Sequence, residues 1–129
     1  MPNPPKTLLI VEDEKPLARA LELKLAHAGF ETTTVSDGEA ALKLLHKEPF
    51  DLVVLDLVMP KVNGFSVLEE LKTKKMSVPV IVLSNLGQEE DKKKAKSLGA
   101  QEFFVKSDTP LVEIVDYVEQ FLVARQRNS

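Results

Sequence analysis

Acidic, hydroxyl and amine side chains stand directly after short apolar runs of this sequence. Glu12 and Asp13 follow the first run, Asp56 and Ser84 follow two later runs, and Lys106 follows the last one. If these runs are parallel strands of one sheet, their carboxyl ends meet at one edge, where open α/β folds bind ligands. Three clustered carboxylates repel one another, and a hard divalent ion such as Mg²⁺ removes that repulsion. The spacing therefore indicates a metal-assisted site.

Asp56 is the candidate nucleophile, because it follows an apolar run at the centre of the expected sheet, where a lone carboxylate is poorly solvated and needs a cation nearby. The chemistry that uses this set is phosphoryl transfer to a carboxylate. Lys106 would contact one phosphoryl oxygen as a point charge, and the hydroxyl of Ser84 would donate a hydrogen bond to another. Singly, these residues are explained as helix caps, turn residues or a surface lysine, and only their joint placement favours a site.

Strands alternating with helices must place these side chains. Five runs rich in Val, Ile, Leu or Thr are separated by segments whose apolar residues recur every three or four positions. Three runs are continuously apolar, which is typical of central parallel strands, whereas 31–35 is polar and β-branched, as in an edge strand. The expected strands are 7–11, 31–35, 52–55, 80–83 and 102–105.

Capping residues mark the ends of the expected helices. Gly29 stops the first helix, and Ser36 opens the second as the N-cap of an S-x-x-E capping box. A third helix follows Gly64, and Thr109 and Pro110 supply the N-cap and the first position of the last one. A further helix is expected at 88–97, so the sequence predicts five helices.

The fourth helix, expected at 88–97, has only one apolar residue before position 98 and can bury little surface. Its acidic start and basic end complement the helix dipole, and Glu89 with Lys93 and Glu90 with Lys94 are favourable i,i+4 pairs. The lysine run is explained equally well as a solvated face or as part of a functional surface.

Length and composition limit the classes of protein to consider. The 129 residues fit one domain, expected to span 1–129 with its core at about 6–124. The formal charge of −3 disfavours direct binding to nucleic acid or to an anionic membrane surface. The absence of Cys excludes disulfides, thiolate nucleophiles and zinc–thiolate sites. No run approaches the roughly 20 apolar residues of a membrane span, and the N-terminus does not resemble a signal peptide, so we expect a cytoplasmic location.

Four elements of the sequence, in this order and spacing, together carry a family resemblance. They are Leu9-Ile10-Val11-Glu12-Asp13, the segment 56–64 from Asp56 to Gly64, Ser84, and Phe103-Phe104-Val105-Lys106. Over nearly its whole length the chain resembles the receiver domain of a response regulator in two-component signalling, similar to a chemotaxis regulator. The resemblance implies a flavodoxin-like α/β fold, with a doubly wound five-stranded parallel sheet of order 2-1-3-4-5 and five helices.

The resemblance also implies what the site does. Asp56 would accept a phosphoryl group from a sensor histidine kinase or a phosphotransfer protein in a phosphorelay, with Lys106 and Ser84 assisting. Glu12, Asp13, Asp56 and the backbone carbonyl of Val58 would hold Mg²⁺ as the cofactor. The domain would be a phosphoacceptor switch that assists its own phosphorylation and dephosphorylation, and not a turnover enzyme.

By the same resemblance, Ser84 and Phe103 would couple phosphorylation to an output face. That face is made by the fourth helix, the fifth strand and the fifth helix. It would contact a downstream effector or output domain, or a second copy of the chain in a phosphorylation-dependent dimer. The sequence does not identify the kinase, the effector, or whether the domain stands alone.

The chain departs from the family pattern at a few positions. Lys106 is followed by Ser107 where the family usually has Pro, often after a cis peptide, and a cis Lys–Ser bond would cost about 2.5–4 kcal/mol. Asn85 replaces a small residue, so small phosphodonors would react slowly. Val58 and Leu86, which flank the path of hydrolytic water in receivers, are apolar here. We therefore expect a long-lived phosphoryl group.

Two other functional classes remain as alternatives. A pseudo-receiver would be a constitutive protein-binding module without phosphoryl chemistry, and failure to bind Mg²⁺ would favour it. A phosphatase or other hydrolase with an aspartyl intermediate would need a second acid to activate water, which Val58 and Leu86 do not offer. Nucleotide binding is weaker still, because the five glycines form neither a P-loop nor a G-x-G-x-x-G motif.

Overall fold

The expected strands form one parallel sheet in the computed structural model, which describes residues 4–127. The strand order is β2-β1-β3-β4-β5, so the doubly wound, flavodoxin-like arrangement is confirmed. β2 lies at an edge, as its polar composition predicts. β4 is one residue longer than expected and ends at Ser84. The strands are β1 (Thr7–Val11), β2 (Glu31–Val35), β3 (Leu52–Leu55), β4 (Val80–Ser84) and β5 (Glu102–Val105).

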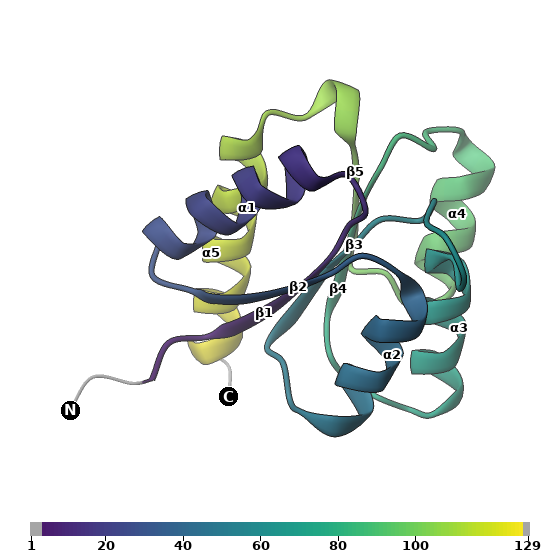
Figure 1. Ribbon diagram of the computed structural model, residues 1–129, viewed down its shortest axis with the longest axis horizontal. Coiled ribbons are helices and arrows are strands. Elements are labelled where there is room, and N and C mark those ends of the chain that lie inside the picture. Colours follow the sequence, from purple (N-terminus) through teal and green to yellow (C-terminus); the bar gives the residue numbers. More distant parts are fainter. Residues whose placement is uncertain (1–3, 128–129) are drawn as a thin grey trace.

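Helices cover both faces of the sheet. α1 and α5 pack on one face, and α2, α3 and α4 lie on the other (Figure 1). In the described residues, no helix combines the length and the apolar character needed to cross a membrane. The helices are α1 (Lys15–His27), α2 (Gly38–Lys47), α3 (Gly64–Thr73), α4 (Glu89–Ser97) and α5 (Leu111–Arg127), and a 3₁₀ turn, η1 (Lys106–Asp108), precedes α5.

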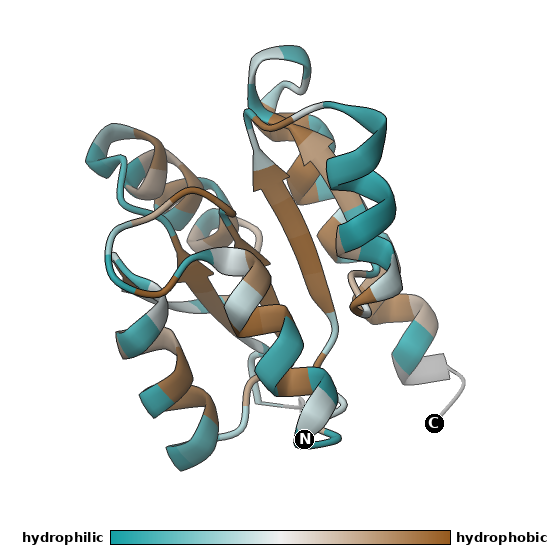
Figure 2. Ribbon diagram, turned by 90° about the vertical axis from the view of Figure 1, so that its right-hand side faces the viewer, coloured by the Kyte–Doolittle hydropathy of each residue, from teal (hydrophilic) through white to brown (hydrophobic). Residues whose placement is uncertain are grey.

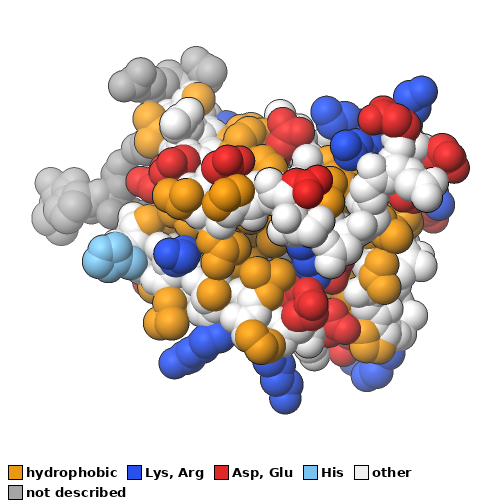
Figure 3. Space-filling view, turned by 90° about the horizontal axis from the view of Figure 1, so that it is seen from above, with side chains coloured by type: hydrophobic (Ala, Val, Ile, Leu, Met, Phe, Trp, Pro, Cys, Tyr) orange, Lys and Arg blue, Asp and Glu red, His pale blue; other side chains and the backbone are white. Residues whose placement is uncertain are grey.

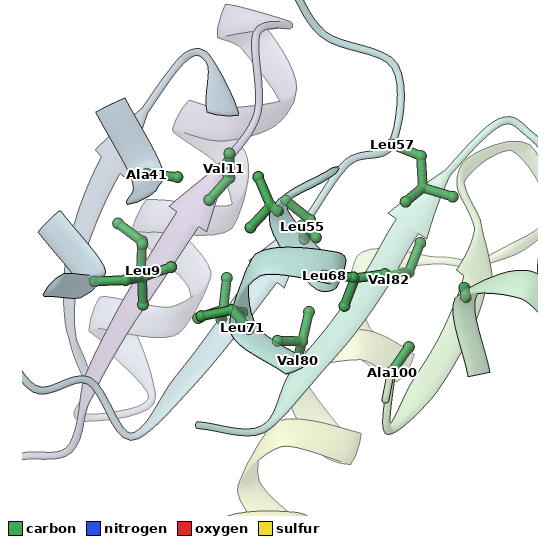
Figure 4. Close-up of a cluster of buried hydrophobic side chains, with 14 of the residues drawn as sticks. Leu9, Val11, Ala41, Leu55, Leu57, Leu68, Leu71, Val80, Val82 and Ala100 are labelled. Atoms are coloured by element: carbon green, nitrogen blue, oxygen red, sulfur yellow. The ribbon is translucent and has the colours of Figure 1, made fainter. Parts of the chain in front are cut away.

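Two apolar clusters, one on each face of the sheet, hold the layers together. Along β1, Leu8 and Ile10 belong to the cluster beneath α1 and α5, while Leu9 and Val11 belong to the cluster beneath α2 and α3. Leu68 of α3 closes the second cluster, and Figure 4 shows it packed near the strand side chains. Burying such a leucine contributes about 1.5–3 kcal/mol. The central strands β3 and β4 are therefore buried along their whole length, and hydrophobic and hydrophilic residues alternate along the helices (Figure 2).

Two expected N-caps are wrong. α2 is capped by Asp37, and not by Ser36: the Asp37 carboxylate accepts a hydrogen bond from the backbone N–H of Ala40 at 2.8 Å. The hydroxyl of Thr109 donates to the carbonyl of Val105 at 2.8 Å, so this side chain closes the η1 turn, and α5 begins at Leu111. Both helices therefore begin one residue later than the sequence predicts.

α4 is held in place mainly by polar contacts. Ala95 is its only buried residue. The two lysine–glutamate pairs expected within the helix are not formed in the part of the chain that the structure describes. Instead, the ammonium of Lys94 lies 4.3 Å from the ring centroid of Phe65 in α3. In addition, Lys72 of α3 donates to the carbonyl of Ser97 at 2.8 Å. α4 is therefore attached to α3 through cations rather than through an apolar face.

The start of α3 lies against the backbone of Asp56 and Leu57, the two residues that follow β3. A Cβ atom added to Gly64 would lie 2.4 Å from the carbonyl oxygen of Asp56 and 2.7 Å from Cα of Leu57. The N–H of Gly64 also donates to the carbonyl of Leu57 at 3.0 Å. Only a hydrogen atom fits at this position, because the neighbouring atoms belong to the backbone and cannot turn away.

We expect Gly64→Ala to lower the free energy of unfolding by about 1–3 kcal/mol, because the added methyl group must displace the backbone beside Asp56. Urea denaturation measures the change. Gly87→Ala is the matched control, since its Cβ would lie 3.4 Å from the nearest atom, a side-chain carbon of Val105. The control should change stability by no more than about 0.5 kcal/mol. Equal effects of the two substitutions would contradict the steric argument.

Candidate functional site

The carboxyl ends of the central strands bring four predicted site residues together. One carboxylate oxygen from each of Glu12, Asp13 and Asp56 lies within 4.8 Å of the others. Lys106, the first residue of η1, reaches the same group. Figure 3 looks onto this end of the molecule and shows acidic and basic side chains side by side among apolar ones. The convergence predicted from the strand ends is therefore confirmed for these residues.

The ammonium of Lys106 is surrounded by carboxylates. Its Nζ atom lies 2.9 Å from Oδ2 of Asp56 and 2.9 Å from Oε1 of Glu12, and it also donates to Oε2 of Glu14. Burial alone would lower the pKa of Lys106, but these hydrogen bonds raise it above its usual value. Lys106 is therefore a fixed positive charge that offsets the buried acids.

Glu14 is the site residue that sequence reasoning missed. It is the N-cap residue of α1, but its side chain makes no capping hydrogen bond. The side chain is half-exposed and reaches the ammonium of Lys106 instead. Its position two residues after Glu12, at the end of the same strand, was the available signal. It offers a counter-ion at the mouth of the site.

Glu12 is almost fully buried, with 4% of its surface exposed. Burial raises the pKa of Glu12 from 4.5 to about 7, and the nearby charge of Asp56 adds to this rise. Hydrogen bonds from the backbone N–H of Glu14 at 3.0 Å and from Lys106 oppose it. This carboxylate is therefore costly to keep charged, and a bound cation would favour the charged form.

Asp56 is equally buried and follows β3 at the centre of the sheet. Its Oδ2 atom accepts from Lys106, and its Oδ1 atom accepts from the backbone N–H of Val58 at 3.3 Å. The side chain of Val58 points outward and is 58% exposed. Asp56 is thus held in place on both oxygens, while the loop after it remains open to solvent.

The donor set fits a hard divalent cation. Glu12, Asp13 and Asp56 offer only oxygen atoms, which Mg²⁺ prefers. Two of these carboxylates are buried and one is exposed, so an ion could be reached from solvent on the side of Asp13. The fit rests on the chemistry and mutual distances of these side chains.

Ser84 and Phe103 are both buried in the neighbouring strands β4 and β5. Ser84 is fully buried at the end of β4, and its hydroxyl accepts a hydrogen bond from the N–H of Leu86 at 3.3 Å. Among the described residues it makes no hydrogen bond to the carboxylates or to Lys106. Phe103 is also buried and belongs to the apolar cluster beneath α2, α3 and α4. Both side chains are therefore turned inward.

The segment after β5 has no cis peptide bond, so the Lys106–Ser107 bond is trans. The η1 turn starts at Lys106. The exposed residue Asn85 reaches this segment from the end of β4, and its Oδ1 atom accepts from the N–H of Ser107 at 3.2 Å. Both residues were identified as departures from the family pattern, but their contact was not foreseen.

Comparison with known proteins identifies relatives of the same kind. A family model described as "Response regulator receiver domain" matches residues 8–118. The chain is 42% identical over 103 residues to the "Probable transcriptional regulator ycf27" of Galdieria sulphuraria, covering 80% of this chain and 40% of that protein. The chain therefore spans about two fifths of the length of this curated relative.

Solved structures agree in fold. The receiver domain of the Francisella response regulator 1452 superposes with a TM-score of 0.87 at 31% identity, covering 96% of this chain and 99% of that one. The Thermotoga maritima response regulator TrrA, solved in complex with Mg²⁺–BeF, gives a TM-score of 0.78 at 32% identity, covering 89% of this chain and 97% of that one.

The raised pKa of Glu12 predicts how stability depends on pH. Because the folded state holds this proton more tightly than the unfolded chain, the contribution of Glu12 to stability falls as the pH rises from about 4.5 to about 7. We therefore expect the stability of Glu12→Gln relative to the wild type to be higher at about pH 8 than at about pH 5. Urea titrations in EDTA at both values measure this difference.

Glu48→Gln, at an exposed glutamate next to the end of α2, is the control and should follow the wild type at both pH values. A Glu12→Gln variant that loses stability relative to the wild type as the pH rises would contradict the assignment.

Proposed function

Because this chain belongs to the response regulator receiver domain family, we propose that it receives a phosphoryl group on Asp56 from a sensor histidine kinase or a phosphotransfer protein. The observation that carries this proposal is the placement of Asp56. It is a buried carboxylate at the carboxyl end of the central strand β3, with an ammonium 2.9 Å away and two further acids beside it.

In the proposed reaction, a carboxylate oxygen of Asp56 attacks the phosphorus atom of the donor. A new oxygen–phosphorus bond forms while the bond from phosphorus to the donor's nitrogen or oxygen breaks, and the leaving group keeps the electron pair and takes up a proton. Lys106 already lies against Asp56 and would stabilise the charge on a phosphoryl oxygen. The sheet fixes both groups, so most of the catalysis would come from positioning.

Glu12, Asp13, Asp56 and the backbone carbonyl of Val58 would hold Mg²⁺ as the cofactor. A bound Mg²⁺ supplies positive charge that offsets both the clustered acids and the incoming phosphoryl group. The oxygen-only donor set of this chain and the Mg²⁺–BeF complex of the Thermotoga maritima relative support this assignment.

Phosphorylation would then act on the face made by α4, β5 and α5. The hydroxyl of Ser84 would leave its contact with the N–H of Leu86 to bind the phosphoryl group, and Phe103 would repack with it. The weak apolar anchoring of α4 supports this part of the proposal, because elements that move in a switch are among the least stable of a fold. The partner would be an effector, an output domain or a second copy of the chain.

We expect the wild type to gain one phosphoryl group when incubated with Mg²⁺ and a small phosphodonor or a kinase, as measured by intact mass. Asp56→Asn should gain none, because it removes the nucleophile and keeps the shape of the side chain. EDTA should prevent the reaction of the wild type. Asp116→Asn, at an exposed acid of α5, is the control and should react like the wild type.

A phosphoryl adduct on Asp56→Asn would contradict the assignment of the acceptor. No adduct with any donor, together with no Mg²⁺ binding, would instead favour a constitutive binding module of receiver fold.

The apolar surroundings of the site also predict a slow loss of the phosphoryl group. Val58 is exposed beside Asp56 and offers no polar group to orient an attacking water molecule. We expect Val58→Asn to speed dephosphorylation by about fivefold to tenfold, the effect of one positioned hydrogen bond. The decay of the adduct in purified protein measures the rate. Val112→Asn, at an equally exposed valine of α5, should leave the rate unchanged. Rapid decay of the wild type itself would refute the prediction.

A further inference from the structure

The side chain of Asn85 connects two segments that carry reactive groups. Its Oδ1 atom accepts a hydrogen bond from the backbone N–H of Ser107 at 3.2 Å. Asn85 directly follows Ser84, and Ser107 directly follows Lys106. One side-chain hydrogen bond thus joins the neighbours of the two residues that would contact the phosphoryl group.

This hydrogen bond continues the pairing of the two strands beyond their ends. The last pair in the register of β4 and β5 is Ser84 with Val105. Beyond this pair the two segments separate. The residues after β4 form the loop before α4, and the residues after β5 form η1. The amide of Asn85 bridges this gap with a single contact to Ser107.

The contact matters because Lys106 has a long, flexible side chain whose origin must be fixed. Lys106 is the first residue of η1, a turn of only three residues. Beyond that turn, the hydroxyl of Thr109 donates to the carbonyl of Val105 at 2.8 Å. The bond from Ser107 to Asn85 holds the middle of the turn. The backbone of Lys106 is therefore fixed from both sides, and its ammonium stays within 2.9 Å of Asp56.

We propose that Asn85 is a positioning residue for Lys106, acting through the backbone N–H of Ser107. The inference rests on the proposed function, since it concerns the speed at which Asp56 is phosphorylated. Asn85 and Ser107 act as one unit, because the contact requires an N–H at position 107, which a proline would lack.

The opposing interpretation of Asn85 is a steric gate that narrows access to Asp56. The two interpretations predict opposite changes in the rate of phosphorylation when Asn85 is truncated. Removing a gate would speed phosphorylation by a small donor, whereas removing a positioning contact slows it. Asn85→Ala therefore separates them in one measurement.

The first experiment tests the hydrogen bond itself. We expect the Ser107 amide proton to exchange with water about threefold to tenfold faster in Asn85→Ala than in the wild type, as NMR would measure, because its acceptor is gone. Asn85→Asp, which keeps an acceptor oxygen, should restore the slow exchange. This measurement needs no phosphodonor and no Mg²⁺, so it does not depend on the proposed function. Unchanged exchange in Asn85→Ala would overturn the proposal.

The second experiment tests the positioning role through phosphorylation rates with a small phosphodonor. We expect Asn85→Ala to slow formation of the adduct by about threefold to tenfold. The same substitution should have no effect in a Ser107→Pro background, where the N–H is already absent. Gln88→Ala is the control, because this residue lies in the same loop and its side chain makes no capping contact.

Faster labelling of Asn85→Ala would establish the gate and overturn the positioning role. Equal slowing in the presence and absence of the Ser107→Pro change would also overturn it, because Asn85 would then act through another group. If the wild type gains no phosphoryl group, the proposed function fails and the kinetic role with it, while the exchange data still decide whether the contact exists.

Discussion

The balance of charge around one ammonium is the constraint on which the site depends. Two carboxylates, those of Glu12 and Asp56, are buried at the carboxyl ends of the apolar strands β1 and β3, where unpaired charges are costly. Lys106 offsets both, and Glu14 adds a partner at the surface. The strand order makes this possible, since β1 and β3 are neighbours and the lysine reaches them from β5 across the end of β4. Any cation or phosphoryl group entering the site must rearrange these contacts.

The remainder of the fold keeps this edge rigid while leaving one flank loose. Both faces of the sheet are covered by apolar clusters, so the positions of the strand ends are fixed by packing. Gly64 allows α3 to start against the backbone of Asp56, which fixes the segment after the central strand as well. α4 contributes little to either cluster. The structure thus combines a fixed reaction site with a weakly attached element next to it.

Much of this arrangement could be predicted from the sequence because it depends on patterns of burial. Continuous apolar runs placed the central strands, and the residues after them placed the carboxylates and Lys106. The choice of Asp37 over Ser36 as N-cap could not be predicted, because both residues can cap a helix. The close approach of Gly38 to Val62 could not be predicted either, because it is a contact between distant segments: a Cβ at Gly38 would lie 2.0 Å from the carbonyl oxygen of Val62. The role of Glu14 and the contact of Asn85 likewise depend on side-chain directions that local spacing does not encode.

The way α4 is attached has a thermodynamic consequence. A helix that packs through a large apolar face exposes that face on release, and the release then carries a large positive heat-capacity change. α4 buries a single alanine and is held by Lys94 over an aromatic ring and by Lys72 on a backbone carbonyl. The side chains of α4 therefore add little to the heat-capacity change of its release, and any larger change must come from the cluster residues that the helix covers, such as Phe103.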